Sequence, residues 1–136
     1  MAINLMQDTN MPPVPESNIY ATIGEDGFAR LVSAFYKGVK TDPILSPMYP
    51  IDDLEGAELR LREFLIQRLG GPTRYSEARG HPRLRMRHAP FPIDIHARNR
   101  WMQLMENAMV EAKLPEDVVV TLRPYFANTA TFMMNR

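Results

Sequence analysis

The feature of this sequence that most constrains its fold is a repeat of apolar residues at helical spacing. Four segments carry the repeat, at residues 25–40, 53–69, 94–112 and 115–134. Because residues three and four apart fall on one face of a helix, each segment predicts an amphipathic helix with one buried side. No segment alternates in the manner of a strand. The chain is therefore predicted to be all-α, with four principal helices packed around one core.

Prolines and glycines are predicted to set the ends of the helices. Ser17 is placed to cap a short first helix, which Gly24 would stop. The Gly-Gly-Pro at residues 70–72 is expected to end the second long helix. Pro124 lies inside the last helical segment, where it predicts a kink or break near residues 120–123.

Length and composition bound the domain organisation and the partners. A chain of 136 residues with 45% hydrophobic residues is long enough for one domain with a packed core. Residues 1–16 hold three prolines and no apolar repeat, so they are predicted to be a flexible extension of a domain spanning residues 17–136. The formal net charge is zero, which argues against binding nucleic acid or a membrane surface by bulk charge.

The composition also excludes several kinds of site. The sequence has no cysteine, which rules out disulfides, zinc–thiolate sites and thiol catalysis. It shows neither a signal-peptide pattern at its start nor an uncharged apolar run near the roughly 20 residues of a membrane span. We therefore expect a soluble, cytoplasmic protein.

One histidine, His88, stands between a run of arginines and two prolines. An irregular stretch is expected from Thr73, and within it residues 81–88 predict about two helical turns that Pro90 would end. The three histidines of the chain form no H-x-x-x-H face, so the two-histidine zinc motif is missing. A single histidine is enough to hold iron when a porphyrin supplies the other ligands.

The basic stretch around His88 has more than one explanation on local pattern alone. A histidine at a helix end is typical of an exposed residue favoured by the helix dipole, and Arg83, Arg85 and Arg87 are typical of a solvated basic face. The same arginines are suited to pair with the two propionates of a haem. A nucleic-acid site built on the seven arginines of residues 74–100 is disfavoured, because the net charge is zero and no known motif is present.

Longer motifs carry a resemblance to a known family. Residues 52–65 are DDLEGAELRLREFL, residues 70–93 are GGPTRYSEARGHPRLRMRHAPFPI, and Trp101 follows the histidine by thirteen residues. This pattern resembles the group II truncated haemoglobins over about residues 18–134. Two departures, an IGEDGF turn in place of a Gly-Gly pair and Leu69 in place of an aromatic residue, do not involve the histidine. The resemblance implies a two-over-two helical globin, in which the first two long helices pair against the last two.

The resemblance also implies a cofactor and its contacts. It implies that the chain binds haem b, with His88 as the one protein ligand of a pentacoordinate iron. It gives Arg87 as the first partner of the haem propionates and Arg85 or His81 as further partners. The other cofactor contacts that it implies are Met86, Phe91, Ile93, Leu61 and Phe64.

On the distal side the resemblance implies three polar aromatic residues, Tyr36, Tyr49 and Trp101. Ala57 falls where many globins keep a polar gate and leaves a small side chain there. Buried tyrosine O–H and tryptophan N–H groups seek partners, and they stabilise the partial negative charge of bound dioxygen. Apolar periodicity alone would equally explain Tyr36 and Trp101 as core residues and Tyr49 as a turn residue.

Two functions of different classes follow from the resemblance. The first is reversible binding of O2, with CO and NO as further ligands, and three distal donors favour slow release of O2. Slow release suits chemistry or sensing better than oxygen transport. The second is redox catalysis, either NO dioxygenation or a peroxide-dependent oxidation, which we expect to need an external reductase. The chain is expected to be a monomer or a homodimer.

Overall fold

Helices make up the regular structure of residues 12–136, the part of the chain that this computed structural model describes. The α-helices are α2 (Ile19–Lys40), α3 (Leu54–Arg68), α4 (Arg74–Arg79), α5 (Leu84–His88), α6 (Ile95–Glu111) and α7 (Glu116–Phe132), with 3-10 helices at η1 (Glu16–Asn18) and η2 (Ser46–Met48). The four long helices are those that the apolar repeat predicts. The prediction of an all-α fold is confirmed for the described range.

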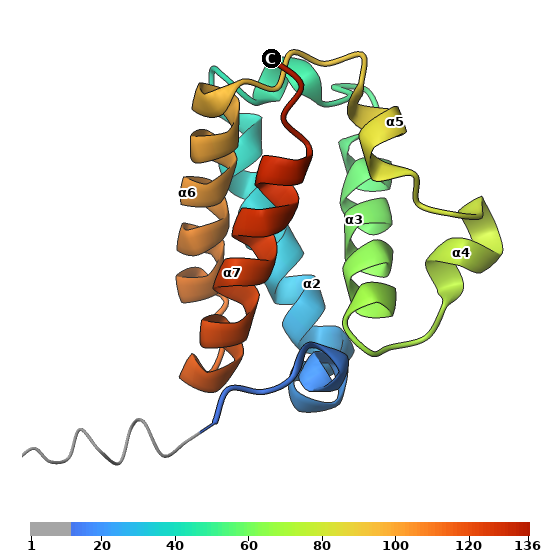
Figure 1. Cartoon of the computed structure of the whole chain (residues 1–136), viewed down its shortest axis with the longest axis vertical. Helices are drawn as coiled ribbons and strands as arrows, with labels where there is room; N and C mark the ends of the chain where they lie inside the picture. Colours follow the sequence, from blue (N-terminus) through green and yellow to red (C-terminus); the bar gives the residue numbers. More distant parts are fainter. Residues whose placement is uncertain (1–11) are drawn as a thin grey trace, which may run out of the picture.

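The long helices are arranged as two pairs. Helix α2 packs against both α3 and α6, and α6 packs against α7. Figure 1 shows α6 beside α7, with α2 behind them and α3 to one side, while α4 and α5 extend beyond α3. This is the predicted pairing of the first two long helices against the last two. None of the helices described is long and apolar enough to cross a membrane.

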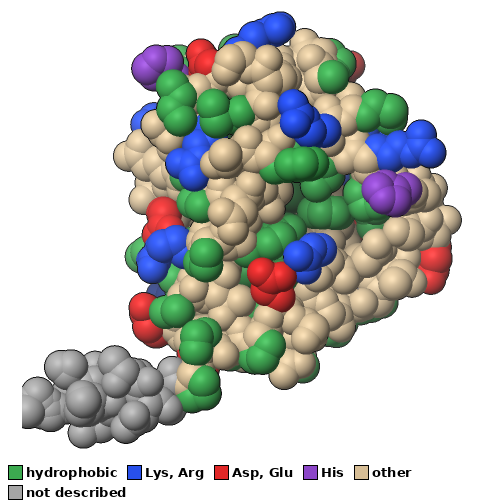
Figure 2. Space-filling model, in the orientation of Figure 1, with side chains coloured by type: hydrophobic (Ala, Val, Ile, Leu, Met, Phe, Trp, Pro, Cys, Tyr) green, Lys and Arg blue, Asp and Glu red, His purple; other side chains and the backbone are tan. Residues whose placement is uncertain are grey.

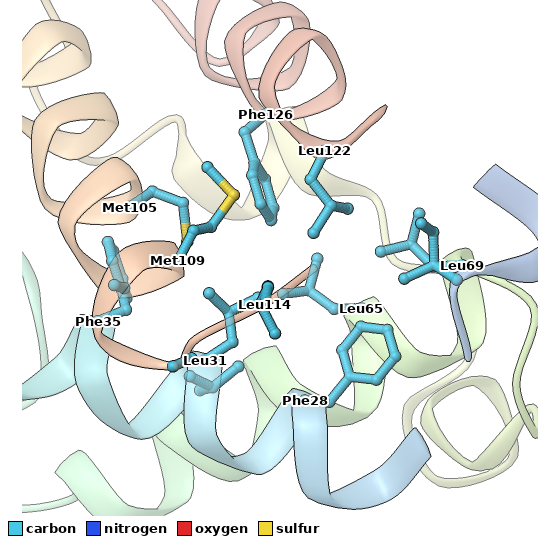
Figure 3. Packing of buried hydrophobic residues seen from close by; sticks show 14 of the residues in the cluster. Phe28, Leu31, Phe35, Leu65, Leu69, Met105, Met109, Leu114, Leu122 and Phe126 are labelled. Carbon is cyan, nitrogen blue, oxygen red and sulfur yellow. The ribbon is translucent and has the colours of Figure 1, made fainter. Parts of the chain in front are cut away.

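The core lies where α2, α3, α6 and α7 meet. Figure 3 shows the buried side chains that fill it, among them Phe28, Leu31, Phe35, Leu65, Met105, Met109, Leu122 and Phe126. Burying a large apolar side chain contributes about 1.5–3 kcal/mol to stability, so this cluster fixes how the helices pack. Met105 and Met109 are only 0% and 1% exposed and belong to this core, as expected for methionines that fill space.

The start of the first helix differs from the prediction. Ser17 lies inside η1 and is not a cap; α2 begins at Ile19, and Asn18 occupies the N-cap position without a side-chain hydrogen bond. The stop expected at Gly24 is confirmed as a kink within α2, where Gly24 has φ 66° and ψ −176°. Only glycine adopts that conformation readily.

The predicted break at Pro124 is wrong, because α7 runs as one helix from Glu116 to Phe132. Proline removes the N–H that would bond the carbonyl four residues earlier. Leu122 and Phe126, on either side of the proline, are both buried. Their burial holds both halves of α7 against the core, so tertiary packing outweighs the local cost of the proline.

The junction between α3 and the start of α2 explains the glycine pair at residues 70–71. Gly70 has φ 102°, and a Cβ atom there would lie 2.1 Å from the Ser17 carbonyl oxygen. Next to it, the Tyr20 N–H donates to the Leu69 carbonyl at 2.9 Å. Gly70 therefore permits the close backbone approach that ends α3 against the first turn of α2.

Helix α4 was not predicted, since an irregular stretch was expected from Thr73. The Gln67 side chain accepts from the Ser76 N–H at 2.9 Å and donates to the Ser76 hydroxyl at 2.7 Å. The Tyr75 ring lies edge-on to Phe64, with centroids 5.6 Å apart. So short a helix depends on contacts with the rest of the fold, and these contacts come from α3, which the local sequence does not reveal.

Helix α5 is shorter than the two turns predicted for residues 81–88. It begins at Leu84, because Arg83 has φ 46° and ψ 52°, a left-handed conformation that a helix cannot continue through. It ends at His88, two residues before Pro90, as the proline predicts.

The predicted N-terminal extension is described only from residue 12, and residues 1–11 lie outside the described range. Within residues 12–16 the Val14 N–H donates to the Asp117 carbonyl at 3.1 Å. The Thr121 hydroxyl donates to the Val14 carbonyl, and Glu16 pairs with Arg68 at 3.0 Å. The chain is thus attached to α7 and α3 from about Val14 onward.

Candidate functional site

A cavity of about 280 Å³ opens between the facing sides of α3 and α7 and is bounded by α5 and α6. Figure 2 shows the hollow, with hydrophobic side chains inside and Lys or Arg side chains around its mouth. Its lining is mostly apolar, as is usual for a small-molecule site. The predicted site residues that line it are Tyr36, Tyr49, Ala57, Leu61, Phe64, His88, Phe91, Ile93 and Trp101.

His88 is the last residue of α5 and lies half-buried at the wall of this cavity. Its Nδ1 lies 2.7 Å from the carbonyl oxygen of Leu84, one turn earlier. A carbonyl oxygen can only accept, so Nδ1 carries the proton. In the neutral ring this leaves the lone pair on Nε2, the tautomer and orientation that metal-binding histidines adopt.

Tyr36 and Tyr49 meet on the side of the cavity formed by α2 and the loop after η2. Their rings are edge-on, with centroids 5.5 Å apart. Trp101 comes from α6 and is held edge-on by Phe35 at 5.3 Å and by Phe126 at 5.7 Å. Three polar aromatic side chains that are far apart in the sequence thus converge on one cavity.

The tyrosine hydroxyls of this cluster stay protonated. Burial raises the pKa of Tyr49 to about 12, against a smaller lowering by the neighbouring Trp101 indole. Burial, and then the neighbouring Tyr49, raise the pKa of Tyr36 well above its usual value. Both phenols are therefore neutral hydrogen-bond donors at physiological pH.

An ion pair between the buried Asp42 and the partly exposed Arg100 fixes the loop that carries Tyr49, and no sequence pattern predicted it. The carboxylate of Asp42, which is 2% exposed, accepts from the backbone N–H groups of Ile44 at 3.1 Å and Leu45 at 2.9 Å. It also accepts from Arg100, the neighbour of Trp101 on α6. Burial opposes ionisation, but Arg100 and the two amides hold the pKa of Asp42 below its usual range. An Asp-Pro pair is a turn signal, yet its partner on α6 is visible only in the fold.

Two predicted cofactor contacts, Met86 and His81, lie outside the cavity lining. Met86 is 58% exposed, because a residue two before His88 in a helix points about 200° away from it. The Nδ1 atom of His81 accepts from the Arg83 N–H at 3.0 Å, so the imidazole is bonded to the backbone just before α5.

The arginines that were predicted beside the cofactor also lie outside the lining. Arg85 donates to the Met134 carbonyl at 3.4 Å, and Arg87 donates to the Pro82 carbonyl at 2.8 Å. The arginines that do line the cavity are Arg60, Arg79 and Arg98. Arg60 follows Ala57 by three residues and Arg98 precedes Trp101 by three, so helical spacing could have predicted that these arginines share a face with the predicted site residues.

The family to which the chain belongs is shown by comparison with known proteins. The model of the family described as bacterial-like globin matches residues 18–135. The chain belongs to the bacterial-like globins, among the group II truncated haemoglobins. The resemblance carried by the sequence motifs is confirmed.

Relatives of this globin share most of its length. The group 2 truncated hemoglobin of Bacillus subtilis is 39% identical over 117 residues, which cover 86% of this chain and 88% of that one. The solved hemoglobin of Chloroflexus aurantiacus is 48% identical with a TM-score of 0.84, covering 90% of this chain and all of that one. The group II truncated hemoglobin of Bacillus anthracis is 38% identical with a TM-score of 0.82, covering 86% and 95%. These matches confirm the two-over-two globin fold, and membership of the family implies a haem protein that binds diatomic ligands.

Proposed function

We propose that this globin binds haem b through Nε2 of His88 and reversibly binds O2, with CO and NO as further ligands. The observation that carries the proposal is the hydrogen bond from Nδ1 of His88 to Leu84, at 2.7 Å, in the wall of an apolar cavity. When bound, the haem supplies a ferrous iron with one open position for a diatomic ligand. Because the sequence has no cysteine, a thioether link to the haem is excluded.

The walls of the cavity suit a flat apolar cofactor. Leu61 and Phe64 on α3, with Phe91 and Ile93 after α5, supply apolar contact and exclude water. Propionates need cationic partners, and Arg79 at the cavity mouth is better placed than the predicted Arg87 because it lines the cavity.

Arg60 and Arg98 are already engaged within the protein. Arg60 pairs with Asp53 at 3.3 Å. Arg98 donates to the Thr131 hydroxyl at 3.1 Å and to the Ala127 carbonyl at 3.2 Å. We therefore assign Arg98 to holding α6 against α7, and Arg79, with Arg60 in second place, to the propionates.

The polar aromatic cluster sets how tightly O2 is held. Tyr36, Tyr49 and Trp101 offer neutral O–H and N–H donors in a mostly apolar cavity. Bound O2 carries partial negative charge and accepts such hydrogen bonds, whereas CO is less polar. Ala57 leaves the space beside these donors open, since its side chain is a single methyl group. The cluster therefore favours slow release of O2.

The proposal is tested by adding haem to the apoprotein and recording its visible spectrum. We expect saturation at one haem per chain, a pentacoordinate spectrum after reduction, and distinct stable spectra with O2 and with CO. A reduced spectrum showing a second protein ligand on the iron would contradict the open position, and lack of saturation would contradict haem binding itself.

A second candidate function is redox turnover with electrons from a separate protein, such as NO dioxygenation or peroxide-dependent oxidation. The observation that favours it is a basic edge next to His88, formed by the exposed residues Arg79, Arg83, Arg85 and Arg87. No aspartate or glutamate interrupts residues 78–93. Such an edge attracts an acidic electron donor and speeds its approach.

The basic edge is tested by the rate at which an acidic flavoprotein reduces the ferric protein. We expect the rate to fall with added salt and to fall in Arg83→Gln. Lys113→Gln removes the same charge from the turn before α7 and serves as the control. Equal rates for both variants would exclude this docking edge.

A further inference from the structure

The C-terminal residues lie beside the loop that joins α5 to α6, as Figure 1 shows. Asn135 forms hydrogen bonds with this loop. Its side-chain nitrogen donates to the carbonyl of Phe91 at 2.8 Å and more weakly to that of His88 at 3.4 Å. Its side-chain oxygen accepts from the Ile93 N–H at 3.0 Å, and its backbone N–H donates to the Ile93 carbonyl at 3.0 Å. One side chain thus ties three residues that are 42 to 47 positions earlier in the sequence.

Helix α5 is too short to orient His88 by itself. It has five residues, and isolated helices of that length are not stable in water. The other polar contacts that it makes with distant parts of the described chain also reach the C-terminal residues. Arg85 donates to the Met134 carbonyl at 3.4 Å and lies over the Phe132 ring, 5.5 Å from its centroid.

We propose that Asn135 is a positioning residue for His88. This rests on the proposed function of His88 as the ligand of the haem iron. Asn135 bonds the carbonyl at the end of α5 and the two residues, Phe91 and Ile93, that line the same cavity. The bond from His88 to Leu84 fixes the rotation of the imidazole relative to α5, and Asn135 fixes α5 relative to the cavity wall.

The arrangement requires a side-chain amide, because one side chain must donate to two carbonyls and accept from an N–H. Asn135→Asp keeps the size and the acceptor toward Ile93. It replaces the donor with an oxygen that faces the carbonyls of His88 and Phe91. Asn128→Asp makes the same chemical change at an exposed position of α7 and is the matched control.

Two measurements on the haem-loaded protein test the proposal. One is the iron–histidine stretching band of the ferrous, unliganded protein, and the other is the rate of haem loss to excess apomyoglobin. In Asn135→Asp we expect the band to shift or broaden and haem loss to be roughly tenfold faster, since about two hydrogen bonds are lost. Asn128→Asp should match the wild type in both. A band that does not move, even with faster haem loss, would show that Asn135 only stabilises the C-terminus.

A second pair of variants covers the case in which Asn135→Asp does not fold. Removal of Arg136 alone leaves the Asn135 side chain in place, while removal of both residues eliminates it. We expect only the second to alter the iron–histidine band, and equal bands in the two would overturn the proposal. If the wild type itself shows no such band, the proposed function of His88 fails; if the band is present but unmoved in these variants, only the role of Asn135 fails.

Discussion

Replacing Trp101 with phenylalanine removes an N–H donor from the cavity while keeping an aromatic ring on α6. The ring contacts to Phe35 and Phe126, at 5.3 and 5.7 Å between centroids, are largely retained by the smaller side chain. A hydrogen bond to a partly charged acceptor contributes about 1.5–3 kcal/mol, and each 1.4 kcal/mol is about tenfold. We therefore expect O2 to dissociate about ten- to a hundredfold faster.

Stopped-flow O2 dissociation on Trp101→Phe measures this effect, with CO dissociation on the same sample as the internal control. CO is the less polar ligand, so its dissociation should change less. A second readout comes from the tyrosine, because the indole lowers the pKa of Tyr49; loss of the indole should raise that pKa further. If the O2 dissociation rate stays within about twofold of the wild type, the indole is a packing residue and the reasoning about donors is refuted for Trp101.

Three further predictions concern stability. Burial raises the pKa of Tyr36, so this phenol stays neutral in the folded state but ionises above about pH 10 in the unfolded state. Its contribution to the free energy of unfolding is therefore complete below pH 10, and above pH 10 it falls by up to about 1.4 kcal/mol per pH unit. Denaturation of apoprotein at several alkaline pH values should therefore show a flatter decline in Tyr36→Phe. Asp42→Ala leaves Arg100 and two backbone N–H groups without their acceptor. It should therefore lower the unfolding free energy, measured by urea denaturation, by about 2–3 kcal/mol, and Asp42→Asn should lower it less. Deleting residues 1–16 removes the bonds of Val14 to α7 and should cost about 2 kcal/mol in the same assay, more than deleting residues 1–11, which keeps them.

The long helices were predictable because each carries its own signal. Apolar spacing located α2, α3, α6 and α7 within a few residues, and Gly24 marked the kink in α2. The failures arise where distant contacts decide the local structure. Helix α4 depends on the amide of Gln67, and α7 continues past Pro124 because the residues around the proline are buried.

The residues of the candidate site also divide into those that the sequence predicted and those that only the fold reveals. The resemblance to a known family named nine residues that line the cavity, from Tyr36 to Trp101, but it did not name other lining residues such as Tyr75, Tyr125 and Phe126. The arginines were not predicted correctly, since nearness to His88 in sequence does not determine which side of α5 a residue faces. Asn135 and the Asp42–Arg100 pair lie 42 to 58 residues from their partners, so no local pattern contains them.

The central claim is that His88 is the protein ligand of the haem, and replacing it with glycine tests that claim most directly. His88→Gly should retain haem poorly and lose the iron–histidine stretching band of the ferrous protein, and added imidazole should restore both by occupying the vacated space. His81→Gly changes an exposed histidine outside the cavity lining and should behave as the wild type. Unchanged haem retention and an unchanged iron–histidine band in His88→Gly, without added imidazole, would contradict the assignment.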